Sequence, residues 1–142
     1  MSEVDYTDVQ GLVRFGYGKM TRACYALARI KDPAAARAWL RSAPITNAVA
    51  MKPPPKSALQ VAFTASGLAA LGVPPSVIDS FSHEFRGGMA QKSRARQLGD
   101  VEENAPKWWH WGGTPSNEPH LVVMFFAEPG RLGNHTAPSC RE

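Results

Sequence analysis

ALQVAFTASGLAALGVP, residues 58–74, is the stretch that decides the fold, because its hydrophobic period changes from strand to helix within one short run. The first half alternates large apolar residues with small or polar ones, a period of two that predicts a strand with one buried face. Thr64 then predicts the N-cap of a helix, which Gly72 and Pro74 end. The large apolar positions of the strand are Leu59, Val61 and Phe63.

Residues 58–74 thus predict a strand-to-helix corner, and the residues before this corner predict a strand, a helix and a weaker strand. Residues 22–30 alternate, with small apolar side chains on one face that suit the close packing of a helix. Asp32 predicts the N-cap of a helix over residues 33–43. Residues 45–51 predict a weak strand, and KPPPK at residues 52–56 separates it from the strand of the corner, because proline does not fit a central strand.

After the corner, the pattern predicts two short helices, a long connection and a buried strand. The helices are expected over residues 75–81 and 89–98. The connection over residues 101–119 is longer than most connections in compact domains, which favours a functional loop or a segment folded over a partner surface. Residues 120–127 are almost continuously apolar, so we expect a strand that is buried on both faces.

Counted from residue 22, the predicted order is strand, helix, strand, strand, helix, strand, which is the order of a ferredoxin-like domain. The expected fold is therefore α+β, ferredoxin-like βαββαβ, with a four-stranded antiparallel sheet whose helices lie on one face. VQGLVRF at residues 9–15 predicts an extra N-terminal strand. We expect one domain over residues 1–127 and a polar, irregular, disorder-like tail over residues 128–142. The second face of the sheet then needs a cover from loops, a partner or another domain.

Composition and charge exclude several classes of function. The chain has 142 residues, of which 44% are hydrophobic and 20% charged, as in an ordinary globular domain. The net charge is +4, and the basic cluster of Lys92, Arg94 and Arg96 lacks the stacking aromatics of a nucleic-acid site. The N-terminus has no secretory signal pattern, and no apolar run approaches the length of a membrane span. We therefore expect a cytoplasmic protein with no nucleic-acid or membrane partner.

The four histidines are the candidate metal, haem and acid–base residues. His83 stands beside Glu84 at a predicted helix start, which favours a surface or capping role over catalysis. His110 lies among three tryptophans, where packing of the cluster against the sheet is favoured over an aromatic-lined pocket. His120 opens the last strand, and His135 lies in the tail. The three tryptophans are Trp108, Trp109 and Trp111.

Motifs that would specify a reaction are absent from the sequence. No two histidines have metal-ligand spacing on one helix, and neither H-E-x-x-H nor G-x-S-x-G occurs. The two cysteines form no C-x-x-C pair, so no zinc site is indicated. Gly87 and Gly88 stand outside any G-x-G-x-x-G motif and predict a turn. The residues therefore assign no catalytic, cofactor-binding or metal-binding position.

Several stretches nevertheless keep a common order along the chain, and together they resemble the N-terminal part of a dye-decolorizing (DyP-type) haem peroxidase. The resemblance covers about residues 8–127. Its most recognisable block is the corner at residues 58–74. The other stretches are residues 8–17, residues 22–40, Phe81, Glu84 to Arg86, Gly88, Met89, Leu98 to Asp100, Pro106 and Trp109.

The resemblance implies a fold and a cofactor without transferring any site residue. In that family two ferredoxin-like halves enclose a haem, peroxide is cleaved by a distal Asp in a G-x-x-D-G motif with a distal Arg, and a proximal His binds the iron. This sequence contains no G-x-x-D-G motif and no histidine after one. Haem is thus expected for the full-length family, and none is expected to bind tightly to this chain alone, because haem needs an axial ligand and an enclosing apolar pocket.

The chain departs from the family pattern at about Pro129, where the polar tail begins. Three explanations fit the departure: a truncated or frame-shifted gene, a split protein, or a small domain with another role; the tail's composition favours truncation. The first functional hypothesis is a DyP-type peroxidase present as an inactive N-terminal domain, whose partner is a second peroxidase half. The alternative is a non-enzymatic ferredoxin-like binding or assembly module that pairs with a second copy. A third hypothesis is a small enzyme that binds haem or a small substrate between two subunits.

Overall fold

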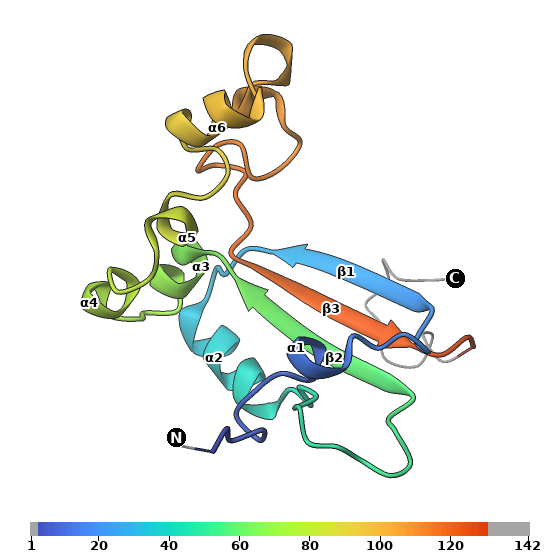
Figure 1. Cartoon of the computed structure of the whole chain (residues 1–142). Coiled ribbons are helices and arrows are strands. Elements are labelled where there is room, and N and C mark those ends of the chain that lie inside the picture. The colour runs from blue at the N-terminus through green and yellow to red at the C-terminus, as the bar shows by residue number, and fades with distance from the viewer. Residues whose placement is uncertain (1–2, 131–142) are drawn as a thin grey trace. The chain divides into compact units, whose positions relative to one another are not determined.

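The computed structural model describes residues 3–130 and has the α+β composition expected from the sequence (Figure 1). The expected tail at 128–142 falls outside the described residues from position 131 onward. None of the described helices has the length and apolar character needed to cross a membrane. In chain order the elements are α1 (Gly11–Phe15), β1 (Arg22–Ala28), α2 (Pro33–Ser42), β2 (Ser57–Phe63), α3 (Ala65–Ala70), α4 (Pro75–Ile78), α5 (His83–Gly87), α6 (Lys92–Leu98), two 3-10 turns (Glu102–Asn104 and Pro106–Trp108) and β3 (Leu121–Ala127).

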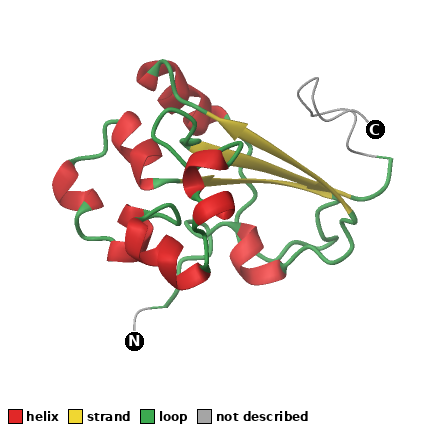
Figure 2. Ribbon diagram, turned by 90° about the horizontal axis from the view of Figure 1, so that it is seen from above, coloured by secondary structure: helices red, strands yellow, loops and turns green. Residues whose placement is uncertain are grey.

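The strands form one three-stranded sheet in the order β1-β3-β2 (Figures 1 and 2). β3 runs antiparallel to both neighbours. The amide of His120, just before β3, donates to the carbonyl of Ala28 at the end of β1 over 2.8 Å, and the amide of Glu128, just after β3, donates to the carbonyl of Lys56 before β2 over 3.0 Å. β1 and β2 are therefore parallel to each other and separated by β3, which is a split β-α-β arrangement with α2 in the connection.

The four-stranded ferredoxin-like sheet predicted from the sequence is wrong, because the sheet has three strands. Residues 9–15, expected as an extra N-terminal strand, contain helix α1. Residues 45–51, expected as a weak strand, run as a loop between α2 and β2 (Figure 1). An isolated bridge between Gln10 and Asn47 joins these two segments.

Groups of Gln10 and Thr46 pair with the outer edge of β2. The Gln10 side-chain amide donates from Nε2 to the carbonyl of Val61 and accepts at Oε1 from the amide of Val61, both over 2.8 Å. Thr46 pairs with Leu59 in a similar way: its backbone amide donates to the Leu59 carbonyl over 3.0 Å, and its hydroxyl accepts from the Leu59 amide over 3.2 Å. These contacts satisfy backbone groups that a neighbouring strand would otherwise pair.

β2 is buried on both faces, although its alternation predicts one buried face. Gln60, on the expected polar face, is only 1% exposed. Its Nε2 donates to the Tyr17 hydroxyl over 3.1 Å and to the Thr46 carbonyl over 2.9 Å, and its Oε1 accepts from the Leu12 amide of α1 over 3.2 Å. The buried amide is thus hydrogen-bonded at both ends, which removes the cost of burying it.

Contacts group the described residues into two units: residues 3–26, 42–62 and 123–130 form the first, and residues 27–41 and 63–122 form the second. The first unit has a small apolar cluster in which the Tyr17 ring lies 5.5 Å from the ring of Phe126. In the second unit α3 contacts α4 and α5. There the guanidinium of Arg37 on α2 also donates to the Leu71 carbonyl over 2.5 Å.

The sequence corner forms as predicted where β2 passes into α3. The Thr64 hydroxyl accepts a hydrogen bond from the amide of Gly67 over 3.1 Å, so Thr64 caps α3. Gly72 follows the helix with a φ of 84°, a left-handed conformation that favours glycine. Asp32 likewise caps α2, because its carboxylate accepts from the amides of Ala34 and Ala35.

Candidate functional site

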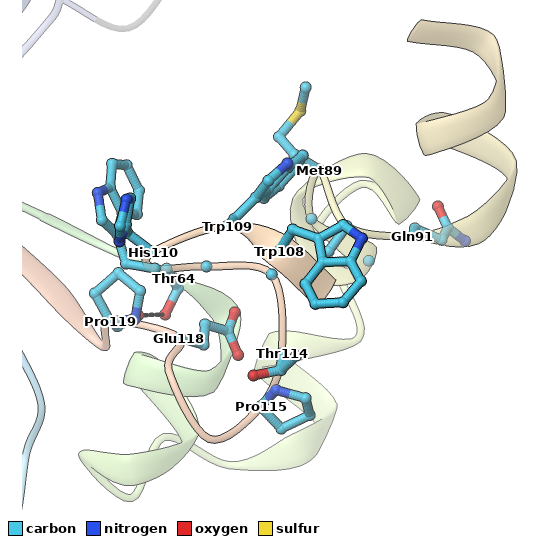
Figure 3. Close-up of a pocket in the computed structure, with 16 residues that line it drawn as sticks. Thr64, Met89, Gln91, Trp108, Trp109, His110, Thr114, Pro115, Glu118 and Pro119 are labelled. Atoms are coloured by element: carbon cyan, nitrogen blue, oxygen red, sulfur yellow. Dashed lines mark hydrogen bonds between the residues drawn. The ribbon is translucent and has the colours of Figure 1, made fainter. Parts of the chain in front are cut away.

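The second unit contains a cleft of about 1000 Å³, which we call the tryptophan cleft (Figure 3). One wall is the turn between α5 and α6, residues 87–91, and the other is the connection over residues 108–119. Thr64 also lines it, and its hydroxyl donates to the Pro119 carbonyl over 2.9 Å. The corner that decides the fold therefore also supports one end of the cleft.

Indole rings dominate the wall formed by the 108–119 connection. Trp108 is 65% exposed and Trp111 is 59% exposed, while Trp109 is half-buried. Across the cleft, Met89 is 51% exposed. The sequence favoured packing of these tryptophans against the sheet, whereas the structure places all three in the lining of the cleft together with His110. Large aromatic side chains that remain this exposed are typical of binding surfaces.

A network of backbone contacts holds this connection in place without regular strands or long helices. The Asn117 side chain donates from Nδ2 to the Trp109 carbonyl over 3.1 Å and accepts at Oδ1 from the Thr114 amide over 2.9 Å. The indole N–H of Trp109 donates to the Asn104 carbonyl over 3.0 Å. Gly113 lies so close to the Pro106 carbonyl that a Cβ atom would not fit. The cleft wall is therefore a packed loop with a defined backbone path.

Among residues 3–130, Glu118 is the one carboxylate that lines the tryptophan cleft, and no Lys or Arg of that range lines it. The residue is half-buried. Within residues 3–130 its carboxylate makes no hydrogen bond and no ion pair. Just outside the cleft, the Lys107 ammonium lies 4.8 Å from the centre of the Trp108 ring, a cation–π contact. The cleft thus combines aromatic faces with a single negative charge.

The two other described histidines, His83 and His120, do not line the cleft. His83 is the exposed first residue of α5, and its Nε2 lies 3.2 Å from Nε2 of Gln91. Beside it, hydrogen bonds from its own backbone amide and from Ser82 lower the pKa of Glu84, so this carboxyl is a poor proton donor near neutral pH. His120 accepts a hydrogen bond at Nδ1 from the Ile30 amide. His135 lies outside the described residues.

The described residues do not fit a haem site. Between residues 3 and 130 no group of three or more His, Cys, Asp or Glu side chains could hold a metal ion. His110 borders an aromatic cleft, but it is exposed on a surface connection and so lacks the enclosing apolar surroundings that haem ligation needs. No iron-dependent step can be assigned to these residues.

Comparison with known proteins supports the fold. No protein-family model matches the chain, and no curated protein matches it. Among solved structures, the chain is similar to a dye-decolorizing peroxidase whose heme pocket was engineered for asymmetric sulfoxidation. The TM-score is 0.61 and the sequence identity is 22%, over 88% of this chain and 27% of that one. The chain therefore has a peroxidase-like fold and spans about a quarter of the length of the peroxidase it resembles.

Proposed function

We propose that the chain is the N-terminal scaffold part of a DyP-type haem peroxidase and contributes fold but no catalytic group. The supporting observation is the alignment of 88% of this chain with only 27% of a dye-decolorizing peroxidase. Most of that peroxidase has no counterpart here, and the G-x-x-D-G motif implied by the family resemblance is missing from this sequence. Haem and peroxide chemistry would accordingly depend on polypeptide beyond these residues.

The first unit offers a surface for that further polypeptide. Tyr25 on β1 is 61% exposed, and its ring lies edge-on to Phe126 of β3 at 6.1 Å. Phe126 is half-buried against the apolar cluster, so the exposed ring is that of Tyr25, and burial of such an aromatic ring stabilises association at interfaces. In this proposal the partner is the second half of the peroxidase.

Titration with haemin tests the proposal directly. The purified chain is expected to give no tight complex with a sharp Soret band and no peroxide-dependent oxidation of a dye. A His110→Ala variant is the control for weak ligation by the exposed imidazole, and any residual haemin absorbance shift should disappear in it. A tight Soret complex with dye turnover in the unaltered chain would overturn the assignment of a scaffold role.

Sedimentation velocity distinguishes the alternative, an assembly module that pairs with itself. The scaffold hypothesis predicts a monomer, or loose concentration-dependent association that Tyr25→Ser reduces. A discrete dimer that persists at low micromolar concentration and survives Tyr25→Ser would favour the assembly module instead. A downstream reading frame encoding G-x-x-D-G and a later histidine would favour the peroxidase.

A further inference from the structure

We propose that the tryptophan cleft binds a small organic cation of the quaternary ammonium class, with Glu118 as its counter-ion. The inference is independent of haem and of the proposed peroxidase role, because it uses only residues of the second unit. It assigns a ligand class to the cleft from its charge, its aromatic faces and its size.

The charge of the cleft points to a cation. Glu118 is half-buried, lacks a hydrogen bond or ion pair among residues 3–130, and has no Lys or Arg beside it in the lining. The oxygens of this carboxylate reach solvent and have no cation beside them in the lining, so a positive group bound in the cleft would be attracted to them and an anion would be repelled. Figure 3 shows the Glu118 carboxylate and the Thr114 hydroxyl directed toward each other on one side of the connection.

The aromatic lining decides which kind of cation fits. Calcium and magnesium need several oxygen ligands, and one carboxylate among indoles does not supply them. A quaternary ammonium carries diffuse charge on methyl groups and is weakly hydrated, so it can exchange water for indole faces. Trp108 already receives the Lys107 ammonium at 4.8 Å, and its 65% exposure leaves further ring surface available.

The size of the cleft fits a small molecule rather than a bare ion. A volume of about 1000 Å³ lies at the upper end of the range for ligand pockets, which is about 300–1000 Å³. The ammonium head would therefore occupy part of the hollow near Glu118 and an indole. The rest of the ligand would extend along the apolar wall that includes Met89.

Isothermal titration calorimetry with choline and its neutral isostere 3,3-dimethylbutan-1-ol tests the proposal, because the two differ chiefly in charge. We expect choline to bind at least about tenfold more tightly than the isostere at constant ionic strength. Glu118→Gln should weaken choline binding by about tenfold and leave the isostere unchanged. Glu103→Gln is the matched control, since Glu103 is an exposed carboxylate on the neighbouring 3-10 turn and does not line the cleft.

A second variant separates the aromatic contribution from any effect on folding. Trp108→Leu removes an exposed indole face and retains apolar surface, so we expect weaker choline binding with unchanged far-UV circular dichroism. Three results would each overturn the proposal. They are the absence of any heat of choline binding, equal affinity for choline and the isostere, and full choline affinity in both Glu118→Gln and Trp108→Leu.

Discussion

The backbone amide of Ile30 donates a 3.0 Å hydrogen bond to Nδ1 of His120. The same histidine joins the ends of all three strands through its backbone, because its amide donates to Ala28 over 2.8 Å and its carbonyl accepts from Thr64 over 3.1 Å. A nitrogen that accepts a hydrogen bond carries no proton of its own, so the ring proton lies on Nε2. His120 is therefore a structural histidine, and its imidazole is not available as a metal ligand at Nδ1.

Replacing His120 tests this role. His120→Ala leaves the Ile30 amide without its acceptor, and we expect a loss of about 1–3 kcal/mol in the free energy of unfolding, measured with urea and circular dichroism. His120→Asn is the matched variant, because its Oδ1 can take the place of Nδ1 and should recover part of that loss. Equal destabilisation by the two variants would show that ring packing, not the hydrogen bond, explains the effect.

Gly67 in α3 should not tolerate a side chain. A Cβ atom there would collide with the backbone carbonyl of His120. We expect Gly67→Ala to destabilise the protein by about 1–3 kcal/mol, even though alanine is intrinsically the better helix residue. Gly18→Ala is the control, since a Cβ atom at Gly18 has no neighbour within 4 Å; its unfolding midpoint should stay the same or rise slightly. A neutral Gly67→Ala would contradict the close approach of α3 to His120.

We expect the free energy of unfolding to fall at alkaline pH because of Tyr17. Burial raises its pKa above the ordinary value of 10.0, so the folded state holds the phenol proton more tightly than the unfolded chain does. This contribution is complete below pH 10 and is lost as the pH rises through the folded-state pKa.

Tyr17→Phe should flatten that alkaline fall in urea unfolding curves. At neutral pH the variant also loses the hydrogen bond from Gln60, which we expect to cost about 0.5–1.5 kcal/mol. An unchanged alkaline profile would assign the effect to other groups.

Gln10 should matter for both stability and solubility, because its side-chain amide pairs with the outer edge of β2 and Gln10→Ala would leave that edge unpaired. Gln10→Ala frees the amide and carbonyl of Val61, and we expect a loss of about 1–3 kcal/mol together with increased light scattering on storage. Gln10→Glu keeps an acceptor for the Val61 amide but loses the donor, so an intermediate result is expected. Unaltered stability in Gln10→Ala would mean that water or nearby backbone groups of the same protein replace both hydrogen bonds.

Local signals in the sequence predicted much of the second unit. Caps at Asp32 and Thr64 and the stop at Gly72 depend on contacts within a few residues, and all three were confirmed. The error in the sheet has a long-range cause. Gln10 pairs with Val61 across 51 positions, and a side-chain amide that substitutes for a strand leaves no hydrophobic period in the sequence. Residues 9–15 could therefore be apolar and alternating and still form a helix.

The sequence predicted only part of the tryptophan cleft. The density of tryptophan around His110 indicated an aromatic cluster, but its orientation depends on Asn117 and on the close approach of Gly113 to Pro106. Glu118 gave no signal, because a lone carboxylate in a connection resembles any solvated residue. Its position in the cleft follows from the backbone path of the loop alone.

The location of the tryptophans also determines what optical measurements on this protein report. Of its 4 tryptophans, three line the cleft and the fourth, Trp39, lies on α2. Intrinsic emission should therefore come mostly from one loop, and because Trp108 and Trp111 are exposed, we expect the emission maximum of the folded protein to lie already toward long wavelength. Fluorescence should reveal ligands and loop movements sensitively while responding weakly to loss of the sheet, which circular dichroism records instead.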